Sequence, residues 1–156
     1  MATLSRTLRR TVAPALLAAA LFVLIPTRAA EPDPKAITYT LPENIPWKKA
    51  ANNDSVMIQG DPSKPGVYIE LIRWHAGNMS RPHFHSTDRY IYVIEGTWWM
   101  GWGPKYDPAS TFPVKAGTFV VHHANQLHYD GAKDADCMLE IVGTGPMQTV
   151  QANQKQ

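Results

Sequence analysis

The sequence is poor in cysteine: Cys137 is the single one among 156 residues. No disulfide can form within the chain, and a metal site built from several thiolates is excluded. Cys137 lies in the apolar run CMLEIV, where a buried and unreactive thiol is the ordinary outcome. The chemistry of this chain must therefore be sought among other residue types.

After residue 30 the sequence also lacks any long hydrophobic run. Residues 1–30 contain arginines without an acid, then the apolar stretch ALLAAALFVLI, then small residues before a cut after Ala29. This layout predicts a cleavable signal peptide, because the stretch is shorter than the roughly 20 residues that span a bilayer. The pair Arg9–Arg10 leaves a twin-arginine export route open beside the general one. We expect a periplasmic or secreted protein with no stable membrane span after processing.

A strong charge of one sign is missing as well. Four of the 15 Lys and Arg residues lie in residues 1–30, which hold none of the 13 Asp and Glu residues, so removing this segment changes the formal net charge from +2 to −2. No basic stripe remains, and nucleic acid is not expected as a partner. The remaining chain, about 126 residues, has the length of one domain.

The sequence after residue 30 also lacks the 3.6-residue hydrophobic periodicity of helices. Short segments rich in β-branched and aromatic residues are separated by Gly, Pro and Asn, which predicts an all-β barrel or sandwich. The predicted strands cover residues 67–74, 89–96, 97–102, 118–123 and 137–142. The predicted organisation is a signal peptide at 1–30, an extended N-terminal arm at 31–55, a β-barrel at 56–150 and a polar tail at 151–156.

Histidine is the residue type that carries chemistry here. In RPHFHSTDR, His83 and His85 lie two positions apart, so on a strand both imidazoles point to one face. Imidazole is a ligand for Zn, Cu, Fe and Ni. His128, which follows a predicted strand and turn, is the best candidate for a third ligand. Taken alone, the pair could equally be two partly solvated surface histidines.

The spacing around the pair resembles the first motif of the cupin superfamily, G-x5-H-x-H-x3–4-E-x6-G. Gly77, His83, His85 and Gly96 occupy the motif positions, and Arg89 stands where the motif has Glu. The predicted strands agree with the places where this motif needs strands. The resemblance extends over about residues 67–142.

The segment from Gly117 to His128 resembles the second cupin motif, which commonly runs G-D, several apolar residues, P-x-G, two residues and H. His128 falls on the ligand position, whereas Thr118 replaces Asp, His123 replaces Pro and Asn125 replaces Gly. Asn125 is an acceptable substitute, because Asn tolerates a positive φ at a turn. The resemblance implies a single-domain cupin jelly-roll barrel with a metal bound inside by His83, His85 and His128.

The usual fourth ligand, a Glu, is absent. Its position holds Arg89, and Tyr90 takes the alternative spacing; neither is an ordinary ligand for a divalent cation. Asp88 is the nearest acid, and a β-bulge would be needed to turn it inward as an alternative ligand. Three neutral histidines leave a dication with its full charge, which favours a small anionic, chelating substrate. Arg89 would anchor that anion, unless it turns out of the barrel or pairs with Asp88.

The resemblance also implies a function. Three-histidine cupins include non-haem Fe(II) dioxygenases, so we predict an exported, metal-dependent dioxygenase-type oxidoreductase for a small anionic or enolisable substrate. The predicted cofactor is a divalent metal ion, Fe(II) first, with Mn, Ni, Zn or Cu as alternatives. Because a fold hosts many functions, a non-catalytic small-molecule or metal-binding module and a Lewis-acid lyase or isomerase stay open.

Further residues are candidates for an outer shell or for the pocket wall. His122 and His123 are adjacent, so at most one of them faces the interior of a barrel, and either is otherwise a structural histidine. Tyr90 and Trp99 are candidate pocket residues, and the tryptophan cluster around Trp99 suits core packing or a homodimer contact equally well. His75, at a strand end, is expected to be structural.

Overall fold

The structure is a computed structural model that describes residues 30–152, so the predicted signal peptide lies outside the described residues apart from Ala30. The chain divides into two units, residues 1–39 and 40–156. In the described part of the first unit, a turn at residues 34–36 is closed by hydrogen bonds from the amides of Ala36 and Ile37 to the carbonyl of Asp33, each 2.9 Å. No helix within residues 30–152 has the length and apolar character needed to cross a membrane.

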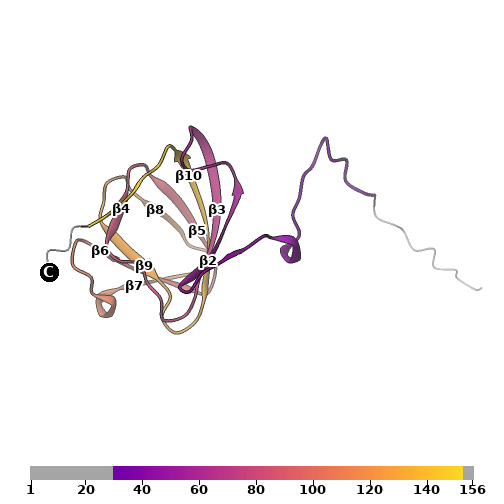
Figure 1. The fold of residues 1–156 in the computed structure, drawn as a ribbon. Helices are drawn as coiled ribbons and strands as arrows, with labels where there is room; N and C mark the ends of the chain where they lie inside the picture. The colour runs from indigo at the N-terminus through magenta and orange to yellow at the C-terminus, as the bar shows by residue number, and fades with distance from the viewer. Residues whose placement is uncertain (1–29, 153–156) are drawn as a thin grey trace, which may run out of the picture. The chain divides into compact units, whose positions relative to one another are not determined.

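The second unit carries the strands (Figure 1). Its elements are η1 (Pro42–Asn44), β1 (Lys48–Lys49), β2 (Asn53–Gln59), β3 (Gly66–Trp74), β4 (His83–His85), β5 (Arg89–Glu95), β6 (Thr97–Trp102), η2 (Pro108–Ser110), β7 (Phe112–Lys115), β8 (Phe119–His122), β9 (His128–Gly131), β10 (Cys137–Gly145) and β11 (Thr149–Gln151). The five predicted strands correspond to β3, β5, β6, β8 and β10. The segment predicted as an arm contains β1 and the first residues of β2.

Two antiparallel sheets form the second unit. The six-stranded sheet has the order β1-β2-β3-β10-β5-β8, and the five-stranded sheet has the order β11-β4-β9-β6-β7. In Figure 1 the strands of the two sheets lie on opposite sides of a common interior. The predicted all-β class is confirmed.

Alternation along the strands decides which side chains enter the interior. In β10, Cys137, Leu139 and Ile141 are buried while their neighbours are less so, and in β5 the same holds for Ile91 and Val93. Burial of each large apolar side chain contributes about 1.5–3 kcal/mol, which makes this interior the main source of stability. Burial also raises the pKa of the Cys137 thiol to about 12. The prediction of a buried thiol is confirmed, and the high pKa keeps it protonated and inert.

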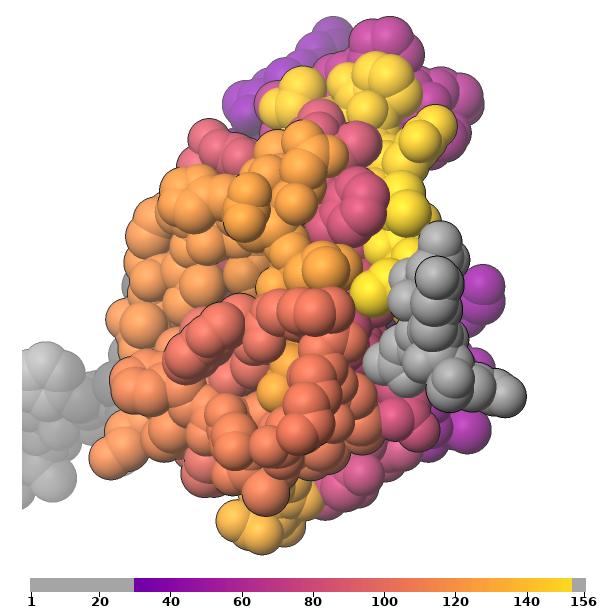
Figure 2. All heavy atoms as spheres, turned by 90° about the vertical axis from the view of Figure 1, so that its left-hand side faces the viewer, coloured from indigo at the N-terminus to yellow at the C-terminus, as the bar shows by residue number. Residues whose placement is uncertain are grey.

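The segment between β6 and β7 is the longest connection of the five-stranded sheet. Tyr129 points to the outer face of that sheet, and its hydroxyl donates to the carbonyl of Asp107 at 3.0 Å. Arg81 lies over the ring of Tyr106, 4.1 Å from its centroid. The salmon-coloured segment in Figure 2 accordingly spreads over the outside of this sheet, so it covers the barrel wall.

Candidate metal centre

The three predicted histidine ligands come together in the interior. His83 and His85 are the ends of β4, and β9 places His128 directly opposite His83 in the antiparallel register. One ring nitrogen of each lies within 4.8 Å of the others, and all three residues are buried. The turn before His128 helps to place it: Asn125 has the positive φ that the sequence predicts, 62°, and its amide donates to the carbonyl of His85 at 2.8 Å.

Backbone carbonyls select the tautomer of two of these histidines. The Nδ1 of His83 lies 2.7 Å from the carbonyl oxygen of Arg81, and the Nδ1 of His128 lies 2.9 Å from that of Gln126. A carbonyl only accepts, so each Nδ1 carries the proton and each Nε2 offers a lone pair. The Nε2 of His128 is buried without a hydrogen-bond partner among the described residues. Both imidazoles are thus prepared to bind a metal through Nε2.

Thr149 selects the tautomer of His85, as the backbone carbonyls do for His83 and His128. It lies opposite His85 in the pairing of β11 with β4, and its Oγ1 lies 3.0 Å from Nδ1 of His85. The hydroxyl donates to Sδ of Met147 at 3.7 Å, so its oxygen is free to accept from Nδ1–H. The sequence carried no signal for Thr149, because only the pairing of the C-terminal strand brings it to the site.

Arg89 points into the barrel. Arg89 is 8% exposed, and its Nη1 donates to Nε2 of His85 at 2.5 Å. The alternative of an arginine turned outward is therefore wrong, and the pairing with Asp88 is wrong too. Asp88 instead accepts a hydrogen bond from the amide of Ala124 at 2.7 Å, which ties it to the loop after β8. Asp88 thus supports the loop that leads to His128 and is not an alternative ligand.

The three imidazoles fit a divalent cation. Burial, followed by the charge of Arg89, lowers the pKa of His85 to about 2, so this imidazole is neutral, as a ligand must be. The guanidinium of Arg89 is an obstacle, because it donates to the lone pair of His85 that a metal would use. A metal held by His83, His85 and His128 therefore requires Arg89 to withdraw from His85.

His122 is a fourth histidine of the interior. It is buried, its ring centroid lies 3.8 Å from that of His128, and its Nδ1 has no hydrogen-bond partner among the described residues. Burial first, then the charge of His128, lowers its pKa to about 2. The prediction that at most one of His122 and His123 enters the barrel is confirmed, because His123 lies outside, with its side chain 73% exposed and 3.9 Å from Asp88.

Asp130 is a site residue that sequence reasoning missed. It lies two positions after His128 on β9, on the same inner face, and one of its oxygens is 4.0 Å from Nε2 of His128. Trp98 donates to the other oxygen at 3.3 Å. Asp130, His122 and His128 form a second group with metal-binding geometry. The signal was present as His-x-Asp, the same parity argument that identified His83 and His85.

Two predicted pocket residues lie elsewhere. Tyr90 is 45% exposed on the outer face of β5, where its ring stacks on Phe119 with centroids 6.4 Å apart. Trp99 carries Lys133 over its ring at 4.0 Å on the outer face of β6, and Trp98 takes the interior position instead. The pocket roles of Tyr90 and Trp99 are corrected for one reason: strand alternation turns both of them away from the interior. The pocket role of His123 is corrected as well, because this residue follows the end of β8 and its side chain is exposed.

The histidine centre borders an internal cavity of about 230 Å³. Ile91, Trp98 and Leu139 form apolar wall, and the polar lining consists of Ser80, His83, Arg89, His122, Asp130, Thr149 and Gln151. This volume is below the roughly 300–1,000 Å³ of sites for drug-sized ligands. The cavity therefore suits a small molecule that contacts His83, His122, Arg89 and Asp130 together.

No protein-family model matches the sequence, and no curated protein matches it either. Solved structures do match: a cupin-like protein from Thermotoga maritima has a TM-score of 0.55 and 17% identity over 68% of this chain and 81% of its own. This chain has the cupin fold. The polyketide cyclase RemF from Streptomyces resistomycificus shares it, with a TM-score of 0.64 and 13% identity over 77% of this chain and 88% of its own.

A third match is the DMSP lyase DddQ from Ruegeria pomeroyi, with a TM-score of 0.58 and 12% identity over 72% of this chain and 63% of its own. Identities this low establish the cupin fold alone. The resemblance seen in the two sequence motifs is confirmed at that level, together with a histidine cluster that has the geometry to hold a metal. The activity has to be argued from the site.

Proposed function

We propose that the protein is an exported enzyme that depends on a divalent metal and acts on a small anionic, enolisable substrate. The observation that carries this proposal is the convergence of three buried imidazoles, one ring nitrogen of each within 4.8 Å of the others, beside the buried cation of Arg89. Three neutral ligands leave the charge of a metal uncompensated, and Arg89 adds a further positive charge. A negatively charged substrate is the complement of such an interior.

The residues around the cavity have separable tasks in this proposal. His83, His85 and His128 would hold the metal, which supplies Lewis-acid polarisation of the substrate when bound. Arg89 binds the anionic group of the substrate. Asp130, held by the indole N–H of Trp98, accepts a proton from the substrate carbon next to the polarised group. The apolar walls exclude water from the proton transfer.

Two reaction types follow from that proton transfer. The first is dioxygenation with Fe(II), which the three-histidine resemblance predicts. The second is a metal-assisted elimination or isomerisation without oxygen, and Asp130 favours it because such a reaction needs a base beside the substrate. Structural neighbours include a DMSP lyase and a polyketide cyclase, which supports this second type.

The experiment separates these outcomes in one preparation. The mature protein is purified without metal and loaded with Fe(II), Mn, Ni, Cu or Zn, and metal content is measured by elemental analysis. Each form is mixed with β-diketones and 2-hydroxy or 2-keto acids while oxygen uptake and product formation are followed. Oxygen uptake with Fe(II) alone supports the dioxygenase, and turnover without oxygen supports the lyase or isomerase. A protein that binds no metal contradicts the proposal, and a metal-loaded protein that turns over none of these substrates favours a binding module.

Export is the remaining part of the proposal. It rests on the arginine-containing start, the apolar stretch and the small residues before Ala29. Expression of the full chain in a Gram-negative host should yield a periplasmic protein that begins at Ala30 by N-terminal sequencing. Retention of the intact start in the cytoplasmic fraction contradicts it.

A further inference from the structure

A row of polar residues crosses the inner face of the six-stranded sheet opposite the histidine centre. The strand register places Tyr68, Gly143, Arg89 and His122 side by side on β3, β10, β5 and β8. Tyr68 is 0% exposed, Arg89 8% and His122 9%. Gly143 makes room for the row, because a Cβ at this position would collide with the Tyr68 hydroxyl.

This row contains donors without acceptors. The hydroxyl of Tyr68 and the Nε of Arg89 are buried and have no hydrogen-bond partner among the described residues. Burial raises the pKa of Tyr68, and the nearby charge of Arg89 opposes this rise. Such buried polar atoms are rare in folded proteins and call for an explanation. Glu70 on β3 feels the charge of Arg89: burial raises the pKa of its carboxyl, and Arg89 opposes this rise. The guanidinium thus lies in the interior with Nη1 bonded to His85 and Nε without a partner, and its charge acts on both Tyr68 and Glu70.

Arg89 and a bound metal would compete for the same lone pair, that of Nε2 of His85. Nη1 of Arg89 donates to Nε2 of His85, and the same Nε2 is the atom that a metal would need. When a metal takes this lone pair, Nη1 joins Nε as a buried donor without a partner. A carboxylate between Arg89 and Tyr68 would accept from both nitrogens of the guanidinium fork and from the hydroxyl.

We propose that Tyr68 and Arg89 form the binding site for the carboxylate of a small substrate, and that carboxylate binding and metal loading assist each other because both draw Arg89 away from His85. The proposal rests on the proposed metal-dependent function and deepens it. Tyr68 is a substrate-binding residue in it, and Arg89 acts on both ligands. By thermodynamic linkage, the factor by which the carboxylate tightens metal binding equals the factor by which the metal tightens carboxylate binding.

The test is a titration of the metal-free mature protein with Co(II), followed by visible absorption. It is run with propionate and, separately, with chloride at the same ionic strength. Propionate carries one carboxylate and does not chelate the metal in solution. In the native protein, propionate should tighten Co(II) binding by at least about fivefold, the lower end of ordinary coupling between sites.

Two variants sharpen the readout. Arg89→Gln should bind Co(II) more tightly than the native protein in chloride, because the competitor for His85 is gone, and should lose the propionate effect. Tyr68→Phe keeps the ring over Gly143 and should reduce the propionate effect, measured as the ratio of its Co(II) affinities in propionate and in chloride. Tyr92→Phe is the matched control, because Tyr92 lies on the outer face of β5, 48% exposed, and this change should alter neither quantity.

The outcomes separate this inference from the proposed function. No Co(II) binding by the native protein contradicts the metal-dependent function itself. Co(II) binding that is the same in propionate and chloride overturns the coupling, and so does weaker Co(II) binding by a folded Arg89→Gln in chloride. If Arg89→Gln does not fold, the native comparison and Tyr68→Phe still decide: a propionate effect that Tyr68→Phe leaves intact overturns the role of Tyr68.

Discussion

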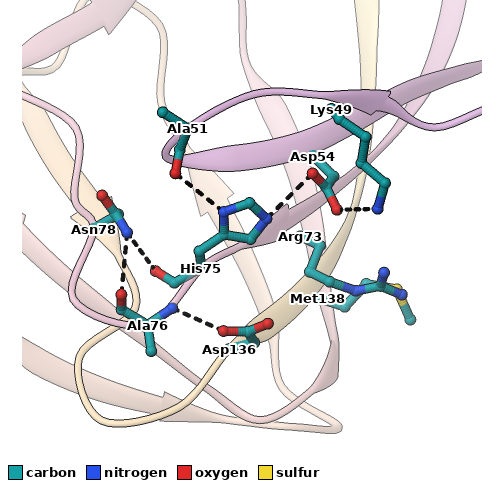
Figure 3. Close-up of polar contacts among 9 residues, drawn as sticks. All are labelled: Lys49, Ala51, Asp54, Arg73, His75, Ala76, Asn78, Asp136 and Met138. Carbon is teal, nitrogen blue, oxygen red and sulfur yellow. Dashed lines mark hydrogen bonds and ion pairs between the residues drawn. The ribbon is translucent and has the colours of Figure 1, made fainter.

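The histidines of this protein lie in two kinds of surroundings. His75, at the end of β3, has an acceptor on each side: the carbonyl of Ala51 is 3.2 Å from Nδ1, and Oδ1 of Asp54 is 3.2 Å from Nε2 (Figure 3). His83 and His128 have a carbonyl at Nδ1, and the buried Nε2 of His128 has no hydrogen-bond partner among residues 30–152. A histidine with both nitrogens occupied is structural, and one with a free, buried Nε2 is prepared for a ligand.

The neighbours of His75 support the structural interpretation. Asp54 is 3% exposed, and its second oxygen lies 2.6 Å from Nζ of Lys49. The hydrogen bond from Lys49 is the main cause that lowers the pKa of Asp54. Figure 3 shows His75 and Asp54 joining β1 and β2 to the end of β3. The prediction that His75 is structural therefore agrees with its contacts.

The largest expected effect is on Zn affinity, and it should separate the ligand histidines from the structural His75. His128→Ala should weaken Zn binding by more than about 100-fold, beyond the 10- to 100-fold that loss of an outer partner costs. His75→Ala should leave Zn affinity unchanged and lower the thermal midpoint. Isothermal titration and thermal denaturation of both variants measure this. Equal loss of Zn affinity in the two variants would remove the distinction.

Acid should destabilise the metal-free protein through its interior histidines. His85 and His122 have pKa values lowered to about 2 in the folded state, against about 6.5 when unfolded. The unfolded chain binds more protons between these values, so stability is complete above pH 6.5 and falls as the pH drops toward 2. Each histidine contributes a slope of about 1.4 kcal/mol per pH unit.

Urea denaturation of the metal-free protein at a series of pH values below 6.5 measures the slope. His122→Phe removes one of the two groups and should make the slope shallower. The same slope in this variant and in the native protein would show that His122 is solvated in the folded state.

A smaller effect is expected from Thr149, which acts through His85. Thr149→Val removes the acceptor for Nδ1–H of His85 and should weaken Zn binding by about 10- to 100-fold. Thr149→Ser keeps the hydroxyl and should restore the affinity, which a merely structural role of the side chain would not require. Titration of the two variants with Zn is the measurement, and failure of Ser to restore affinity counts against the orienting role.

The smallest effect should come from the surroundings of His75. Asp54→Asn loses the charge that pairs with Lys49 and His75, and should lower the thermal midpoint by a few degrees with Zn affinity unchanged. Asp134→Asn, at an exposed position, is the matched control with no expected change. A change of Zn affinity in Asp54→Asn would mean that the two regions are coupled.

The alternation of side chains along a β-strand gave most of the site predictions that the sequence allows. It placed His83 and His85 on one face, and the motif that ends at His128 supplied the third ligand; all three are together in the structure. The same reasoning applied to His-x-Asp would have found Asp130. It did not select between the faces for Tyr90 and Trp99, because both faces of their strands carry large apolar residues and the pattern is ambiguous there.

The sequence by itself determined five of the strands and the placement of His83 and His85 on one face, because these depend on spacing within a strand. The resemblance to the two motifs added His128 and showed that Arg89 stands in place of an acid. Only the tertiary structure decided what those residues meet. Thr149 reaches His85 by pairing of the C-terminal strand, and Tyr68 reaches Arg89 across Gly143. Such contacts depend on the register between strands far apart in the chain, and this register is set by packing of the whole interior.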